Sequence, residues 1–291
     1  MTTINSLEIL LKPYKGLDKI RVGSTFDGGY ILPKASITKC KRVLSFGIST
    51  NIDFERQMAE LNSNMVIHMY DPFIGPLSDL KRLMKRVTGN HTPVKRDIKL
   101  KVNDQYKNQG KGIVLETISR FFHWGGFYRF IAQKNIDYKK IGLSNSDDKL
   151  FTSFPTIFKK IGDEKDIIVK MDIEGYEYKV YKDLLQFSSR ISVLLLELHE
   201  VDYNKQMIVD MIQSLKDKGL FLIHIHGNNS DVLVNDSSIP NTLELSFACN
   251  EYIEQQYDTT TYPDAVLDAP CNPYWEDYQL DFLKKQIIDT N

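Results

Sequence analysis

Residues 167–172 form a short apolar run that ends in a carboxylate, and this stretch restricts the fold more than any other part of the chain. The run reads IIVKMD, and IEGYE and a helical pattern over 176–186 follow it. An apolar run of this length is typical of a strand buried on both faces of a sheet. A helix directly after the strand indicates a parallel sheet, in which ligands bind beyond the carboxyl ends of the strands. We therefore expect Asp172 at the mouth of a ligand site.

The same alternation of apolar runs and helical patterns continues along the chain. Further strands are predicted at 42–50, 65–72, 136–144, 191–201, 220–229 and 241–249. The clearest helix follows the strand at 191–201, because Ile208, Met211, Ile212 and Leu215 have helical spacing and Gly219 ends the pattern. The sequence therefore predicts an α/β fold with a mostly parallel sheet that helices cover on both faces.

The predicted domain organisation has three parts. Residues 1–38 are interpreted as an N-terminal cap that contains a short helix and a hairpin around Asp27-Gly28-Gly29. Residues 39–291 are interpreted as the main domain, with an insertion at 76–134 in which neither strand nor helix periodicity is regular.

The composition of the chain gives no sign of a nucleic-acid or membrane partner. The chain has 291 residues and a formal net charge of -1, which favours neither nucleic acid nor a membrane surface. Its three cysteines form no CxxC pair, no signal peptide is evident, and no apolar run is long enough to span a bilayer. We expect a cytoplasmic protein. Ten Lys or Arg residues and two acids lie between residues 81 and 111, which indicates either a solvated basic face or attraction for a phosphorylated substrate.

Two strand ends carry residues that suit a nucleoside ligand. Gly47 follows the apolar run of the first core strand, where a strand–glycine–helix turn exposes backbone N–H groups to a ligand. Asp71 ends the next strand, 24 residues after Gly47, at the distance where an acid binds a ribose diol in doubly wound folds. A lone glycine is a weak signal, and Asp71-Pro72 also suits a simple turn.

Histidines and acids at other strand ends are candidates for chemistry. His199 and His226 follow or end the strands at 191–201 and 220–229, close to Asp172 and Glu174 in the predicted sheet. A histidine beside a carboxylate suits general base catalysis, and the same groups can bind a divalent metal, which we favour less. The neighbouring Glu197 and His224 are interpreted as core polar groups. In the N-terminal hairpin, Arg21, Asp27 and Tyr30 either belong to a simple turn or face the site and contact substrate.

The motif KMDIEGYE resembles the KxDxEGxE signature of the FkbM family of S-adenosylmethionine-dependent methyltransferases. The order of the other pieces is similar as well: SFGIST, YDP and IGLS precede the motif, and LLLELHE follows it. The resemblance covers about residues 42–228. The sequence departs from the family's glycine-rich pattern after Gly47, where it has Ile48-Ser49-Thr50 instead of further glycines.

This resemblance implies a class I methyltransferase fold, which is a Rossmann-like, seven-stranded, mostly parallel sheet with helices on both faces. It implies S-adenosylmethionine as the methyl donor and O-methylation of a sugar, glycan or related small metabolite, in bacterial surface-polysaccharide or natural-product biosynthesis. The cofactor-binding positions that it implies are Gly47, Ser49, Asp71, Leu143, Ser144 and Asp172. Leu143 and Ser144 would lie at the adenine. His199 is our first candidate for the base and His226 the second, with Asp172 orienting one of them.

Two other functions fit the strand pattern. A nicotinamide-dependent sugar oxidoreductase would share the fold, although GxGxxG is missing and KMDIEGYE counts against it. A non-catalytic binding protein on a degenerate methyltransferase fold would keep the apolar strands and lose the acids at their ends, but Asp71 and Asp172 are both present. The acceptor is predicted to be a small molecule or glycan, phosphorylated or nucleotide-linked if the basic segment takes part.

Overall fold

The computed structural model describes residues 2–49, 51–75, 124–231, 233–234 and 238–285. Residues 76–123, which make up most of the predicted insertion and all of its basic segment, lie outside these ranges. Among the described residues, no helix is both long and apolar enough to cross a lipid bilayer.

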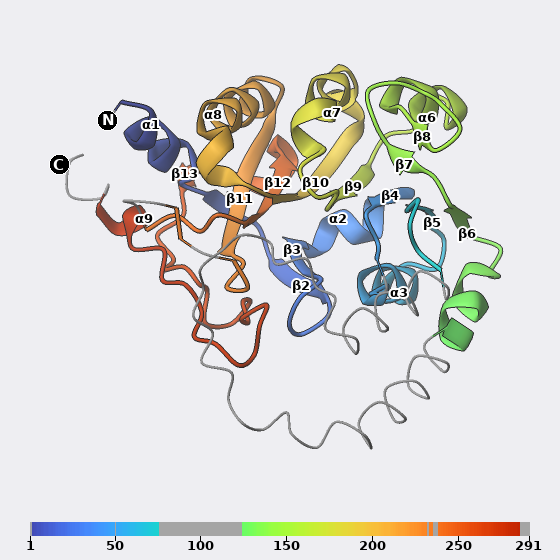
Figure 1. The fold of residues 1–291 in the computed structure, drawn as a ribbon, viewed down its shortest axis with the longest axis horizontal. Helices are drawn as coiled ribbons and strands as arrows, with labels where there is room; N and C mark the ends of the chain where they lie inside the picture. The colour runs from blue at the N-terminus through green and yellow to red at the C-terminus, as the bar shows by residue number, and fades with distance from the viewer. Residues whose placement is uncertain (1, 50, 76–123, 232, 235–237, 286–291) are drawn as a thin grey trace, which may run out of the picture.

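A seven-stranded sheet forms the centre of the described chain, in the order β11-β12-β10-β9-β4-β5-β6 (Figure 1). Neighbouring strands are parallel except where β12 takes part, since β12 runs antiparallel to both β10 and β11. Its strands are β4 (Arg42–Phe46), β5 (Val66–Tyr70), β6 (Ile136–Lys139), β9 (Ile167–Met171), β10 (Ile191–Leu198), β11 (Leu220–Gly227) and β12 (Leu243–Cys249). The predicted Rossmann-like, mostly parallel sheet is confirmed.

Smaller elements surround this sheet. Three two-stranded sheets are present in the described ranges: β1 (Tyr14–Gly16) with β13 (Ile253–Tyr257), β2 (Lys19–Gly23) with β3 (Gly29–Pro33), and β7 (Gly142–Leu143) with β8 (Phe151–Thr152). The helices are α1 (Thr2–Leu10), α2 (Lys34–Lys39), α3 (Asp53–Leu61), α6 (Phe154–Lys160), α7 (Glu177–Leu184), α8 (Val201–Asp217) and α9 (Phe282–Lys285), with 3-10 turns η2 (Leu185–Arg190) and η3 (Asn250–Tyr252). Residues 124–131 are also helical.

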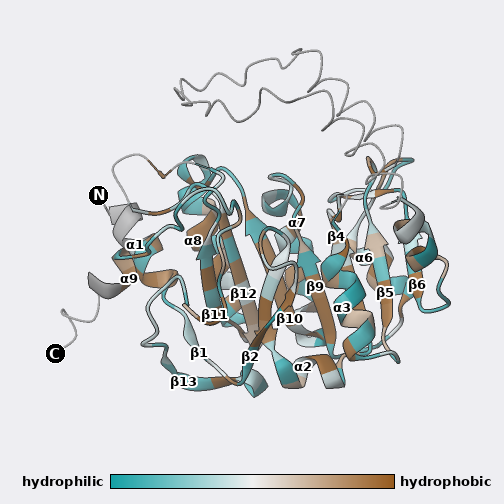
Figure 2. Cartoon of the chain, turned by 90° about the horizontal axis from the view of Figure 1, so that it is seen from below, coloured by the Kyte–Doolittle hydropathy of each residue, from teal (hydrophilic) through white to brown (hydrophobic). Residues whose placement is uncertain are grey.

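Helices lie on both faces of the sheet, as the sequence predicts. The helices α6, α7 and α8 cover one face, and α2, α3 and the β2–β3 hairpin lie against the other (Figure 1). Alternate residues of the central strands supply the two cores: Leu194 and Leu196 of β10 face α8, whereas Val193 and Leu195 face the hairpin side. Hydrophobic residues therefore dominate the strands, and hydrophilic residues lie on the outer surfaces of the helices (Figure 2).

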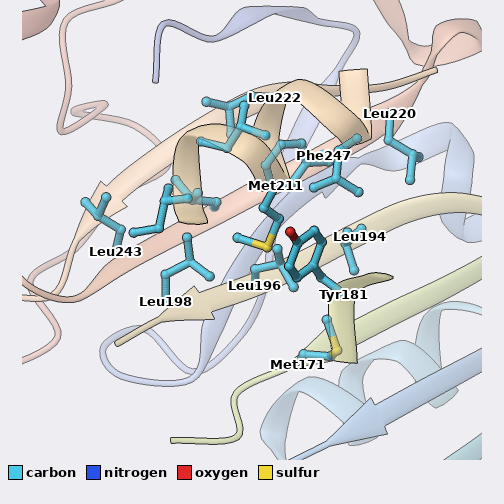
Figure 3. Packing of buried hydrophobic residues seen from close by; sticks show 14 of the residues in the cluster. Met171, Tyr181, Leu194, Leu196, Leu198, Met211, Leu220, Leu222, Leu243 and Phe247 are labelled. Carbon is cyan, nitrogen blue, oxygen red and sulfur yellow. The ribbon is translucent and has the colours of Figure 1, made fainter. Parts of the chain in front are cut away.

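The α8 side of the sheet shows why the apolar spacing predicts these elements. Met211 of α8 packs among Leu196 of β10, Met171 of β9 and Tyr181 of α7 (Figure 3). All eight residues of β10 are buried, and burial of a Leu or Met side chain contributes about 1.5–3 kcal/mol. The helix ends before Gly219, whose φ of 82° is left-handed, so the predicted stop is confirmed.

Segments far apart in the sequence meet around this frame. The predicted hairpin is present, with Val22 opposite Tyr30 across β2 and β3, and it packs against α3 and β12. The strand predicted at 136–144 is shorter than expected, because β6 ends at Lys139 and the next two-residue strand, β7, pairs with β8 instead. The carboxyl ends of the parallel strands β4, β5, β9 and β10 lie at one edge of the sheet.

Candidate functional site

A cavity of about 340 Å³ lies beyond the carboxyl ends of β4, β5 and β9. Its wall combines polar groups with aromatic side chains. The lining residues are Gly47, Ser49, Tyr70, Asp71, Pro72, Phe73, Gly142, Leu143, Phe151, Asp172, Ile173, Glu174 and Tyr176. Five of the six predicted cofactor residues are among them, and Ser144 is the exception.

Gly47 occupies a position where a side chain does not fit. Its φ is 72°, and its N–H donates a 3.0 Å hydrogen bond to the Tyr70 carbonyl at the end of β5. A Cβ atom at Gly47 would lie 1.6 Å from the carbonyl oxygen of Asp172. The Lys170 ammonium lies 3.3 Å from the Gly47 carbonyl on the same turn. The glycine therefore brings the ends of β4, β5 and β9 into close approach.

Asp71 organises the polar end of the cavity through three backbone N–H groups. One carboxylate oxygen accepts a 2.9 Å hydrogen bond from Ser49, and the other accepts from Phe73 at 2.8 Å and Ile74 at 3.0 Å. Ser49 has a left-handed φ of 47°, so this bond fixes a strained part of the turn after β4. Asp71 thus links the glycine turn to the end of β5, besides lining the cavity.

We expect Asp71→Ala to lower the free energy of unfolding by about 2–4 kcal/mol, because three N–H groups lose a charged acceptor. Asp71→Asn keeps one acceptor oxygen and should lose about half as much. Urea unfolding followed by circular dichroism measures both variants. Equal stability of Asp71→Ala and the parent chain would contradict this structural role.

The other end of the cavity is apolar and aromatic. The rings of Phe151 and Tyr176 lie parallel with centroids 6.0 Å apart, and Leu143 lies in the same wall. A Cβ at Gly142 would come within 2.7 Å of the Phe151 ring, so a larger residue would narrow this end. Ser144 does not line the cavity, and its N–H donates to the Thr152 carbonyl.

His199 lies beside the cavity with four carboxylates around it. Its Nε2 is 3.8 Å from Asp172, 3.7 Å from Glu174 and 3.9 Å from Glu197. Its Nδ1 is 3.5 Å from Oε1 of Glu177, a fully buried acid whose Oε1 also accepts a hydrogen bond from the Ile173 N–H. These separations are ion-pair distances rather than short hydrogen bonds. The predicted Asp172–His199 neighbourhood is therefore present, and Asp172 borders both the cavity and this group.

The acids around His199 change its protonation. Burial alone would lower the pKa of His199, but its contact with Glu177 and the charges of Glu197, Glu177 and Asp172 outweigh burial and raise the pKa to about 9. Burial raises the pKa of Asp172 to about 6, even though Lys170 and His199 favour its charged form. In the ligand-free site, His199 is therefore mainly an imidazolium at neutral pH.

The β2–β3 hairpin supplies a second wall next to His199. Oxygens of Asp27, in the hairpin turn, lie within 4.8 Å of oxygens of Glu197 on β10 and Glu244 on β12. Tyr30 is buried beneath them, with the Lys170 ammonium 5.2 Å from its ring centroid. Arg21 is used differently, because its guanidinium donates to the backbone carbonyls of Ser24, Phe26 and Leu267. The hairpin thus brings Asp27 and Tyr30 to the acids, whereas Arg21 holds the turn.

His226 is buried away from the cavity, and both of its ring nitrogens are engaged. Nδ1 lies 2.7 Å from Glu244, and Nε2 lies 3.0 Å from Asp277. Burial would lower the pKa of His226, but the hydrogen bonds with Asp277 and Glu244 outweigh it and hold the pKa well above its usual value. His226 therefore supports Glu244, and of the two predicted histidines only His199 faces the site.

Several residues of the site were not assigned by the sequence reasoning. Lys170 and Glu177 belong to the KMDIEGYE motif, so the motif was the signal that could have identified them. Phe151 follows the polar segment 144–150 and carried no periodic signal. Glu244 belongs to a predicted strand, and only its register opposite Glu197 shows that it reaches the site.

The family comparison falls on the strands that build this site. Residues 131–221 match the family model of the methyltransferase FkbM domain. This segment of the chain is similar to the methyltransferase FkbM domain. The matched segment includes the KMDIEGYE motif, β9 and β10, so the FkbM resemblance that this motif carries is confirmed. No protein of curated function matches the sequence.

Several solved structures match part of this chain with low similarity. An FkbM methyltransferase from Methylobacillus flagellatus shares 12% identity over 71% of this chain and 43% of its own, with a TM-score of 0.35. A fibrillarin pre-rRNA processing protein from Methanococcus jannaschii shares 9% sequence identity with this chain. The match covers 74% of this chain and 68% of the fibrillarin chain, with a TM-score of 0.37. Fibrillarin from Aeropyrum pernix, solved with S-adenosyl-L-methionine, shares 10% sequence identity with this chain. The match covers 73% of this chain and 68% of the fibrillarin chain, with a TM-score of 0.34.

Proposed function

We propose that this chain is an S-adenosylmethionine-dependent O-methyltransferase that acts on a hydroxyl group of a sugar, glycan or related small metabolite. The observation that carries the proposal is the position of Asp172. This residue lies in the segment that matches the FkbM domain, and it borders both a nucleoside-sized cavity and a group of acids around His199. A methyl donor in the cavity and an acceptor beside the acids around His199 would therefore meet at Asp172.

The cavity has the chemistry that S-adenosylmethionine requires. Phe151, Tyr176 and Leu143 offer an apolar wall for the adenine, and Asp71 lies where a ribose diol can bind. The turn at Gly47 and Ser49 would receive the amino acid part, and Asp172 would face the positive sulfonium. When bound, the cofactor supplies a methyl group that needs no further activation.

The acceptor hydroxyl needs a base, and His199 is the group placed to serve. The donor would supply its methyl group to the acceptor oxygen and leave as the neutral thioether, and Nε2 of neutral His199 would receive the hydroxyl proton. The neighbouring acids stabilise the imidazolium that results. Much of the rate would come from holding the two reactants in line.

The charges of the site select among acceptors. Asp27, Glu197 and Glu244 would repel a phosphate near the point of transfer, whereas vicinal hydroxyls can donate hydrogen bonds to them. We therefore favour a polyhydroxylated acceptor whose reacting end is neutral. A phosphorylated or nucleotide-linked acceptor fits only if its charged part lies away from these acids. A role in bacterial surface-polysaccharide or natural-product biosynthesis would supply acceptors of this kind.

Two measurements test the proposal. Calorimetry should show binding of S-adenosylhomocysteine and none of NAD, whereas the reverse would favour a nicotinamide-dependent oxidoreductase. Labelled methyl transfer to a panel of sugars, nucleotide-linked sugars and glycans should then identify the acceptor. Failure to bind S-adenosylhomocysteine at about 1 mM, well above a typical cofactor affinity, would overturn the proposal in favour of a non-catalytic binding protein.

The protonation of His199 makes the reaction pH-dependent. We expect kcat/KM to rise as pH approaches about 9 and to level off above it, because only neutral His199 can accept a proton. Activity is lost as pH falls through that pKa, since the imidazolium form then dominates. Initial rates between pH 6 and pH 10.5 measure this rise of kcat/KM with pH, and His199→Ala should abolish it. A rate that is independent of pH across this range in the parent enzyme would contradict His199 as the base.

A further inference from the structure

The first turn of α7 contacts His199 at two points. Glu177 begins the helix and is fully buried, and its Oε1 lies 3.5 Å from Nδ1 of the imidazole. The next residue, Tyr178, donates a 2.5 Å hydrogen bond from its hydroxyl to the carbonyl oxygen of His199. The residue before Glu177 is Tyr176, which lines the cavity. Three consecutive residues thus connect the cavity wall with the side chain and the backbone of His199.

The carboxylate of Glu177 is itself held in place. Its Oε1 accepts a 2.7 Å hydrogen bond from the backbone N–H of Ile173, in the turn after β9. Within the described residues, Oε2 of Glu177 and Nδ1 of His199 are both buried and have no hydrogen-bond partner. Buried polar atoms are rarely left unpaired, and the hydrogen bonds of catalytic groups often shorten only when ligands bind. These two atoms therefore indicate a hydrogen bond between Glu177 and the imidazole in the occupied site.

The two nitrogens of the imidazole have different surroundings. Nδ1 is buried and faces Glu177. Nε2 lies 3.8 Å from Asp172, 3.7 Å from Glu174 and 3.9 Å from Glu197. In the described chain, these four acids are the carboxylates within 4 Å of the ring. Because Asp172 and Glu174 line the cavity, Nε2 is the nitrogen on the side where donor and acceptor would meet.

We propose that Glu177 is a positioning residue for His199. Its carboxylate accepts a hydrogen bond from Nδ1–H, so the neutral imidazole keeps the Nδ1 proton and presents the lone pair of Nε2 to the acceptor hydroxyl. A lone pair at Nδ1 would instead lie against a buried carboxylate, which is unfavourable. Tyr178 fixes the backbone from which the ring extends. The catalytic value of this arrangement rests on the proposed function, but the tautomer of His199 does not.

Nitrogen NMR of the isotope-labelled chain, without cofactor or acceptor, tests the tautomer directly. At about pH 10, above the pKa of about 9, the chemical shifts of the two ring nitrogens show which one carries the proton. The chain has six histidines, and the signals that His199→Ala loses identify His199. We expect the proton on Nδ1. A proton mainly on Nε2 would overturn the proposal, and this measurement requires no variant at position 177.

Glu177→Gln and Glu174→Gln form a matched pair for the same measurement. Each variant removes one carboxylate near the imidazole, but Glu177 faces Nδ1 whereas Glu174 faces Nε2. Glu177→Gln should lose the preference for a proton on Nδ1, because its amide can donate to Nδ1 as well as accept from it. Glu174→Gln should keep this preference. Circular dichroism shows whether each variant is folded, and equal tautomer populations in the two folded variants would contradict the role of Glu177.

The enzyme assay gives a second readout. Glu177→Gln should lower kcat by about tenfold or more and leave the affinity for S-adenosylhomocysteine unchanged. The rise of kcat/KM should also move to lower pH, because burial lowers the pKa of His199 and the Glu177 carboxylate is among the groups that raise it. A merely structural role would not move the pH profile. A kcat and a pH profile equal to those of the parent enzyme would refute positioning by Glu177.

The outcomes separate this proposal from the proposed function. A proton on Nδ1 in a chain that does not bind S-adenosylhomocysteine supports the positioning by Glu177 and refutes the methyltransferase proposal alone. A proton on Nε2 in a chain that transfers methyl groups refutes the positioning alone.

Discussion

Replacing His199 by alanine is expected to lower kcat by about 100-fold or more, which is the usual contribution of a general base. Nε2 of the imidazole lies 3.8 Å from Asp172 and 3.9 Å from Glu197. Its removal leaves the acceptor proton without a receiver, while the walls of the cavity stay unchanged. Affinity for S-adenosylhomocysteine should therefore stay the same, and the loss should appear in turnover at saturating cofactor.

His68→Ala is a matched control for this variant. His68 also lies beside a carboxylate, at 2.8 Å from Asp137, but it belongs to the middle of β5 and does not line the cavity. We expect nearly normal turnover from His68→Ala once its folded fraction is taken into account. If His199→Ala keeps turnover within about threefold of the parent enzyme with unchanged cofactor binding, His199 is not the base.

Replacing Gly47 by alanine should damage both cofactor binding and stability. The added methyl group would lie 1.6 Å from the Asp172 carbonyl oxygen, so β4 and β9 would have to separate at the mouth of the cavity. We expect S-adenosylhomocysteine affinity to fall by about tenfold or more, because the ends of these strands carry the proposed cofactor contacts. Calorimetry and thermal unfolding measure the two effects.

Gly162→Ala isolates the part of this effect that comes from backbone conformation. Gly162 also has a left-handed φ, 64°, but a Cβ there would meet no atom within 4 Å. Its substitution costs only the left-handed conformation, about 1–2 kcal/mol. Gly47→Ala should cost about 1–3 kcal/mol more, as overpacking does. Equal losses from the two variants would show that close approach at Gly47 is unimportant.

The fold could be predicted because residues close together in the sequence identify each main strand and helix. Each strand is a short apolar run, and the spacing of Ile208, Met211 and Leu215 fixes the face of α8. Both β1 and β13 were missed, since strands of three and five residues at the edge of the fold carry little hydrophobic periodicity. The early end of β6 was missed for a similar reason, because the pairing of β7 with β8 depends on a contact across the chain.

The site was predictable only in part. Residues at strand ends, such as Asp71 and Asp172, follow from the rule that ligands bind at carboxyl ends of parallel strands. The sequence analysis placed His199 ahead of His226, but it could not show which acids reach each histidine through the folded chain. His226 lies between Glu244 and Asp277, and the latter is 51 residues away. The convergence of Asp27 with β10 and β12 likewise depends on tertiary packing.

The pairing of β1 with β13 has a consequence for how the protein is made. Tyr14 of β1 lies opposite Tyr257 of β13, so these partners are 243 residues apart in the chain. At the usual rate of synthesis, the ribosome needs roughly 10–50 s to cover that distance. The donor cavity uses residues 47–176 and can assemble on the emerging chain, whereas β3 gains its contact with β12 only near the end. Translation thus makes every lining residue of the donor cavity before it makes β12, which carries part of the acceptor side.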